Sequence, residues 1–96
     1  MKRQGDILIK RIDQLPKEAR LKKDNVLVYG ESTGHTHRLE GGEVYQTPDS
    51  LLYLLIANKG KIVHEEHKPI SLKAGKYGVI RQKEYTNKDA VRLVVD

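Results

Sequence analysis

The hydrophobic residues of this chain fall in short runs that alternate with polar and turn-forming residues. Asp6–Ile12 is a run of branched apolar residues followed by polar positions, and Asn25–Gly30 repeats this pattern. Short runs rich in Val, Ile and Tyr that are bounded by turn-forming residues predict β-strands. Strands are expected at 6–12, 25–30, 35–39, 51–56, 61–64, 77–85 and 91–95.

One apolar run, at 51–56, fits either a helix or a strand. A serine precedes it and could cap a helix, and a glycine beyond its end could terminate one. A continuous apolar run of this length also fits a strand that is buried on both faces. Residues 58–60 (Asn-Lys-Gly) are typical of a hairpin turn into 61–64, so the hairpin is the favoured prediction. A second turn is expected at 73–76.

About eight short strands with regularly spaced turns, and no long amphipathic helix, predict an all-β fold, either a small β-barrel or a β-sandwich. At 96 residues and 11.0 kDa, the chain is expected to form a single domain spanning 1–96. Residues 13–24 contain a proline and many charges, which predicts an exposed loop. The core must be built from Val, Ile and Leu, because the chain has no Phe or Trp.

The composition excludes several classes of protein. Without cysteine, the chain can form neither disulfides nor thiolate metal sites. The longest apolar run has seven residues and no apolar signal region follows the first residues, so we expect a cytoplasmic protein without a membrane partner. The formal charge of +5 suits nucleic acid, but positive and negative residues are interspersed, so nucleic-acid binding is an alternative that is not favoured.

All four histidines of the chain lie in two short motifs. The first is Gly34-His35-Thr36-His37-Arg38, and the second is His64-Glu65-Glu66-His67-Lys68-Pro69. In an extended strand, alternate residues share a face, so His35 and His37 would present their imidazoles to the same place. Imidazole suits divalent metals such as Zn, Fe, Mn or Ni. The pattern therefore predicts a divalent metal held by a histidine cluster, in a protein whose substrate is unknown.

The second motif limits which histidines can share one metal. If it stayed extended, His64 and His67 would lie on opposite faces of the strand. Both can bind the same ion only if the chain bulges or turns before Pro69, where proline already disfavours a regular strand. The expected metal ligands are, in order of preference, His35, His37 and His64, and then His67.

Two glutamates stand between the histidines of the second motif. If the protein is an enzyme, Glu65 or Glu66 is the expected catalytic base, acting on water that the metal activates. Without a metal, the histidines could instead bind or cleave RNA by general acid–base catalysis, with Arg38, Lys61 or Lys68 holding a phosphate. A structural or assembly protein is the third alternative, and the thin core with its strand edges makes a homo-dimer plausible.

The first motif carries a resemblance to a known family. Gly34-His35-Thr36-His37, followed some thirty residues later by a histidine and then by the stretch Pro69–Gly75, is similar to the metal-binding motifs of cupins. Cupins are small double-stranded β-helix barrels that hold a metal between two motifs. The resemblance implies a cupin-like barrel with a divalent metal.

A second resemblance extends over nearly the whole chain, to a family of small uncharacterised bacterial and phage proteins. It implies that the motifs GHxHR and HEEHxPI occur together with two further segments, and it implies no particular activity. The segments that carry it are Gln4–Leu8, Gly30–Arg38, His64–Ile70 and Arg81–Tyr85.

Overall fold

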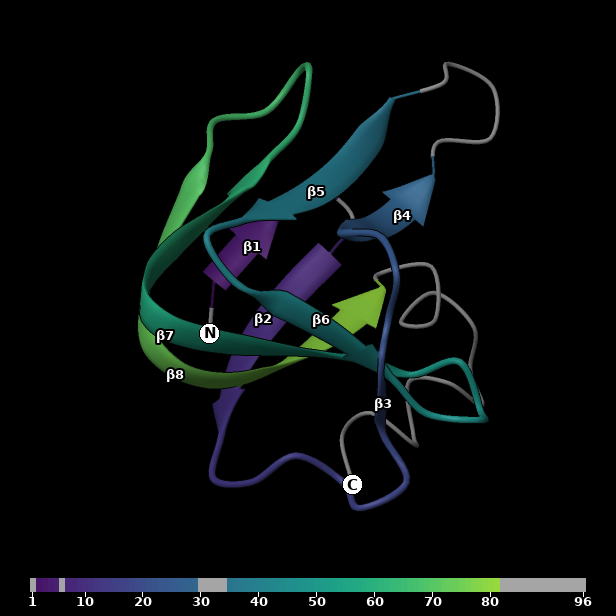
Figure 1. The fold of residues 1–96 in the computed structure, drawn as a ribbon. Helices are drawn as coiled ribbons and strands as arrows, with labels where there is room; N and C mark the ends of the chain where they lie inside the picture. The colour runs from purple at the N-terminus through teal and green to yellow at the C-terminus, as the bar shows by residue number, and fades with distance from the viewer. Residues whose placement is uncertain (1, 6, 30–34, 82–96) are drawn as a thin grey trace.

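The structure is a computed structural model that describes residues 2–5, 7–29 and 35–81 (Figure 1). These residues form eight antiparallel strands in one sheet, and the described part of the chain contains no helix. The strands are β1 (Lys2–Gln4), β2 (Ile7–Ile12), β3 (Arg20–Leu21), β4 (Val26–Tyr29), β5 (Thr36–Glu40), β6 (Glu43–Gln46), β7 (Leu52–Val63) and β8 (Ile70–Arg81). The all-β prediction is confirmed. The strand expected at 91–95 and the end of the one expected at 77–85 lie outside the described residues.

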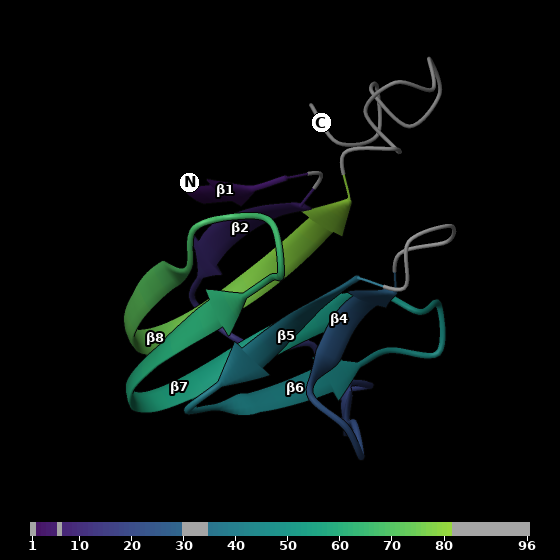
Figure 2. The ribbon, with the colours of Figure 1, turned by 90° about the horizontal axis from the view of Figure 1, so that it is seen from above.

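The sheet follows the path β1-β2-β8-β7-β5-β4, with β6 paired to β7 and β3 paired to β6. In the part of the chain that is described, this path ends at β1 and β4, so no backbone pairing closes the sheet into a barrel. The long strands β7 and β8 curve strongly (Figure 2), which folds the sheet around its own core. Residues 13–24, expected as a loop, contain the two-residue strand β3.

The predicted hairpin at 51–64 is wrong, because β7 runs as one strand from Leu52 to Val63. Its first half pairs with β6 and its second half with β5, and the register shifts between Ile56 and Lys59. Gly60 is needed for close packing rather than for a turn, since a Cβ there would lie 2.7 Å from the Glu40 carbonyl oxygen. A glycine within a strand often marks such a close backbone approach.

The predicted turn at 73–76 is also wrong, because β8 passes through it without a break. Gly75 lies opposite Ile56 in the register, at the irregular part of β7. It has a φ of +152°, which side chains rarely adopt, and the Arg11 guanidinium lies against its backbone. Both glycine signals therefore mark places where a long strand bends, not where the chain reverses.

Branched aliphatic side chains fill the inside of the curved sheet, as the composition predicts. Ile7 and Ile9 alternate with less buried residues along β2, which is the pattern of a strand with one face in the core. The buried hydrophobic residues are Ile7, Ile9, Leu27, Val28, Leu39, Val44, Leu54, Ile56, Ile62, Ile70, Leu72 and Tyr77. None of the described residues forms a helix long and apolar enough to cross a membrane.

Candidate functional site

The four histidine rings lie close to one another, although their two motifs are some thirty residues apart. The ring centroids of His37 and His64 are 4.3 Å apart, and those of His64 and His67 are 4.6 Å apart. His35 joins from the other side, with its centroid 5.6 Å from that of His64. His64 is thus the ring that neighbours all three others.

Strand β5 positions the first motif. His37 is 4 % exposed and Leu39 is 1 % exposed, whereas Arg38 and Glu40 between and beyond them face solvent. His35 precedes the strand, and its side chain keeps 31 % of its exposure. His35 and His37 are two positions apart, but they differ sharply in burial. His37 lies in the core, and His35 lies at its edge.

The second motif leaves the sheet where β7 ends. The strand stops at Val63, and the chain bends through 65–67 before β8 begins at Ile70. This bend brings His64 and His67 to the same side, as their ring distance shows. The predicted departure from a regular strand before Pro69 is confirmed.

Gln4 is the residue that organises the site, and the sequence analysis did not single it out. It is 2 % exposed, and its side-chain amide donates to the carbonyl oxygens of Ile62 and Lys68, both at 2.8 Å. Those two residues flank the histidine loop, so one side chain fixes both ends of it. The only signal for Gln4 was its place in a segment that accompanies the histidine motifs.

The same amide fixes the protonation of His37. Because Gln4 Nε2 donates to two carbonyls, its Oε1 is the acceptor in the 2.9 Å contact with His37 Nδ1. His37 Nδ1 therefore carries the proton, and in the neutral imidazole the lone pair is on Nε2. The contact joins β1 to β5, which are separated by three strands in the sheet.

Gly5 packs directly against the histidines at the start of the turn after β1. A Cβ at this position would lie 2.7 Å from His67 Nε2 and 3.4 Å from His37 Cε1. Gly5 also has a φ of +57°, in the left-handed region that favours glycine. The glycine therefore admits the His67 ring to a space that any other residue would occupy.

The two glutamates of the second motif have different partners. Glu65 accepts the Thr36 backbone N–H at 3.1 Å, which ties the loop to the start of β5. Its own backbone N–H is the main cause that holds the pKa of Glu65 below its usual value. Desolvation opposes this, and the Thr36 N–H and the neighbouring His35 and His64 add smaller lowering effects. Glu65 is therefore a stable carboxylate and a weak base.

Glu66 instead contacts two of the histidines. Its Oε1 lies 2.5 Å from His35 Nδ1, and its backbone N–H donates to His64 Nδ1 at 3.0 Å. A His64 ring that accepts on Nδ1 carries its proton on Nε2 when neutral. His64 and His37 therefore hold opposite tautomers.

A metal ion would need three side-chain donors that converge on one point. Within residues 2–5, 7–29 and 35–81, no three His, Asp or Glu side chains converge in a way that could hold one as they lie. His37 Nδ1 is held by Gln4 Oε1, and His64 Nδ1 is occupied by the Glu66 N–H. Of the predicted ligands and bases, the structure brings the four rings together and directs Glu65 and Glu66 to the protein itself.

Comparison with known proteins places the chain in a family. A family model described as "Domain of unknown function (DUF8820)" matches residues 3–82. The chain belongs to this family. The DUF8820 match includes Gln4 and both histidine motifs, and it agrees with the expectation of a family without an assigned function. No curated protein and no solved structure matches the chain.

Proposed function

We propose that the chain binds a divalent transition-metal ion through His37, His64 and His67. The observation that carries the proposal is the contact between Gln4 Oε1 and His37 Nδ1. A histidine that binds a metal through one nitrogen nearly always donates its other N–H to an oxygen acceptor, which fixes the tautomer and the ring orientation. Gln4 supplies that acceptor and is itself held by two carbonyl groups.

The separations of the three rings support the same ligand set. With a metal–nitrogen distance of about 2.1 Å, two imidazoles on one ion have centroids roughly 4.5–5.5 Å apart, and somewhat more at wide angles. The three centroid distances are 4.3, 4.6 and 6.2 Å. The rings therefore lie at about the separations of ligands on one ion, although their nitrogens do not yet point to a common centre.

Binding would require His64 and His67 to rotate, whereas His37 is already oriented. His64 would exchange the hydrogen bond from the Glu66 N–H for the metal, or turn its ring to offer Nε2. His67 is exposed and can change rotamer at small cost. In this proposal His35, paired with Glu66, stands beside the ligands rather than among them.

We further propose that the metal is held in a cupin-like arrangement. The two histidine motifs come from β5 and from the loop after β7, and they meet where the curled sheet brings β1 toward β5. If the protein is an enzyme, the metal would supply Lewis acidity, and Glu66 is the better candidate base because the lowered pKa of Glu65 weakens it.

A metal-free acid–base function is the second candidate, and the His35–Glu66 contact favours it. A carboxylate at 2.5 Å from Nδ1 would orient the His35 ring, as in other histidine–carboxylate pairs that act in catalysis. The neighbouring His64 could then act as the partner acid. This candidate predicts RNA cleavage that persists in a chelator, whereas a metal-dependent function would be lost there.

The metal proposal is tested by elemental analysis of untagged protein and by calorimetric titration of the stripped protein with Zn²⁺. The matched variant is His37→Asn, because the asparagine amide can still donate to Gln4 while the Nε2 ligand is removed. We expect near-stoichiometric metal in the wild type and a loss of affinity of at least about tenfold in the variant. His35→Gln should keep the affinity within about threefold. Equal zinc affinity in the wild type and His37→Asn would contradict the proposal.

A further inference from the structure

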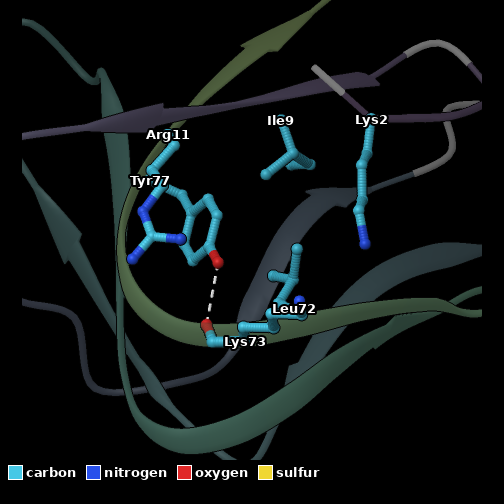
Figure 3. A pocket seen from close by; sticks show the side chains of 6 residues that line it. All are labelled: Lys2, Ile9, Arg11, Leu72, Lys73 and Tyr77. Carbon is cyan, nitrogen blue, oxygen red and sulfur yellow. Dashed lines mark hydrogen bonds between the residues drawn. The ribbon is translucent and has the colours of Figure 1, made fainter.

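A cavity of about 330 Å³ lies between β1, β2 and β8, apart from the histidines. Its lining residues are Lys2, Ile9, Arg11, Leu72, Lys73 and Tyr77. Figure 3 shows Arg11 and Tyr77 together at one end of the cavity and Lys2 at the other, with Ile9 and Leu72 between them. The cavity therefore combines side chains from strands that are far apart in the sequence.

The charged side chains of the lining all have the same sign. Arg11, Lys2 and Lys73 bring three cations, and none of the described lining residues is acidic. Lys2 lies opposite Ile9 in the register of β1 and β2, so Lys2 and Arg11 are diagonal neighbours on one face of this strand pair. Neighbouring cations repel one another, and an anion placed between them would relieve that repulsion.

Arg11 is held in place by three features of its surroundings. Its guanidinium lies over the Tyr77 ring, 5.9 Å from the centroid, and donates to the Ala74 carbonyl oxygen at 3.0 Å. Gly75 leaves the space that the guanidinium occupies, because a Cβ there would come within 2.9 Å of an Arg11 nitrogen. An ordered guanidinium loses less entropy when it binds an anion than a freely moving one would.

The three cations gather along the start of β8 and keep donors for a ligand. Lys2 Nζ reaches across to β8 and donates to the Ser71 carbonyl oxygen at 2.6 Å, and Arg11 reaches the Ala74 carbonyl oxygen on the same strand. Lys73 lies between these two acceptors in the sequence. An ammonium group has three N–H donors and a guanidinium has five, so both retain donors after these bonds are made.

The base of the cavity is apolar and closed. Ile9 is 1 % exposed and Leu72 is 2 % exposed, so they offer almost no surface to a ligand. Tyr77 is also buried, and its hydroxyl donates to the Lys73 carbonyl oxygen at 2.8 Å (Figure 3). A base of low polarity strengthens the attraction between the cations and an anion beside them. A ligand is therefore recognised here by its charge and its acceptor atoms.

We propose that this cavity binds a phosphate group, either free phosphate or the terminal phosphate of an ester, between Arg11, Lys2 and Lys73. The planar guanidinium fits two phosphate oxygens at once, and each ammonium adds a compact charge. A terminal phosphate carries about two negative charges and three acceptor oxygens, which match three cations better than the single charge of a phosphodiester. The site shares no residue with the histidine motifs or with Gln4, so it stands whether or not those motifs bind a metal.

The test is calorimetric titration of the full chain, at neutral pH and constant ionic strength, with inorganic phosphate, glycerol 3-phosphate and dimethyl phosphate. The tighter of the first two should bind at least about tenfold more strongly than dimethyl phosphate, which has one charge and no terminal phosphate. Which of the two is tighter identifies the source of the phosphate group, and either order supports the site. Dimethyl phosphate binding as tightly as both would overturn the ligand class, and no binding of any probe would overturn the site.

Variants separate this cavity from general attraction to a basic protein. Arg11→Gln and Lys73→Gln should each weaken binding of the tighter probe by at least about fivefold, since each removes a charge-assisted contact. The glutamine at position 11 can still donate to the Ala74 carbonyl oxygen, so the fold is retained. The matched control is Lys10→Gln, which loses the same charge one position from Arg11, on the opposite face of β2. Equal losses in Lys10→Gln and Arg11→Gln, with melting temperatures unchanged, would overturn the proposal.

Discussion

The substitution Gln4→Met tests whether one buried amide holds the histidine site together. Methionine has nearly the volume and shape of glutamine but no polar amide, so packing is retained while the hydrogen bonds are lost. Three bonds disappear, those to the carbonyls of Ile62 and Lys68 and that from His37 Nδ1.

The loss of unfolding free energy follows from the polar groups that Gln4→Met leaves without a hydrogen-bond partner. The Ile62 carbonyl and the His37 N–H are in buried contacts, and each would cost about 1–2 kcal/mol when unsatisfied. The Lys68 carbonyl is in a partly buried contact, where water can replace part of the bond, at about 0.5 kcal/mol. The sum is about 3 kcal/mol of unfolding free energy, which lowers the melting temperature by roughly 12–24 °C.

Urea and thermal unfolding of the chelator-treated protein measure this loss without a contribution from bound metal. The control is Gln14→Met, because Gln14 lies in the exposed segment after β2 and should change stability by less than about 0.5 kcal/mol. If Gln4→Met matched the control, the hydrogen bonds of Gln4 would not stabilise the fold and the reasoning would be refuted.

Three further substitutions test other contacts. Gly5→Ala should cost about 1–2 kcal/mol for its left-handed φ and should lower zinc affinity by displacing His67; unchanged zinc titration would argue against the contact. Glu65→Gln should destabilise the protein at neutral pH only, because the pKa of Glu65 is lowered in the folded state. Its carboxylate then stabilises the fold above the unfolded pKa, near about 4.3, and this stabilisation is lost as the pH falls through the folded pKa. The unfolding curves of the two proteins should therefore converge in acid. Leu54→Ala, at 0 % exposure, should cost about 2–5 kcal/mol by urea unfolding, against under about 1 for Leu51→Ala at 45 % exposure; similar losses would be inconsistent with the observed core.

Local pattern predicted the strands well where one face is buried. Alternation and branched residues located β2, β4 and β5 to within a residue or two. The same reasoning misread the glycines at positions 60 and 75, because a glycine that admits a neighbouring backbone or side chain looks the same in a sequence as one that makes a turn. What distinguishes them is the β5–β6 turn packed on Gly60 and the Arg11 side chain packed on Gly75, both contacts with distant residues.

The candidate site was also predictable only in part from the sequence. The clustering of histidines and the need for a bend before Pro69 could be read from spacing alone. Gln4 could not, because nothing local to a glutamine near the N-terminus indicates a partner on β5. That partner depends on the curvature of β7 and β8 (Figure 2), which brings Gln4 of β1 within hydrogen-bonding distance of His37 on β5.

The most direct test of the account is two-dimensional NMR of the imidazole nitrogens during titration of the stripped, ¹⁵N-labelled protein with Zn²⁺. We expect His37 to be protonated on Nδ1 before and after zinc is added, with the shift of its Nε2 moving to that of a metal-bound nitrogen. His64 and His67 should respond at the same zinc equivalent. A His37 spectrum that does not change on saturation with zinc, or one that shows Nδ1 bound to the metal, would contradict the proposed centre.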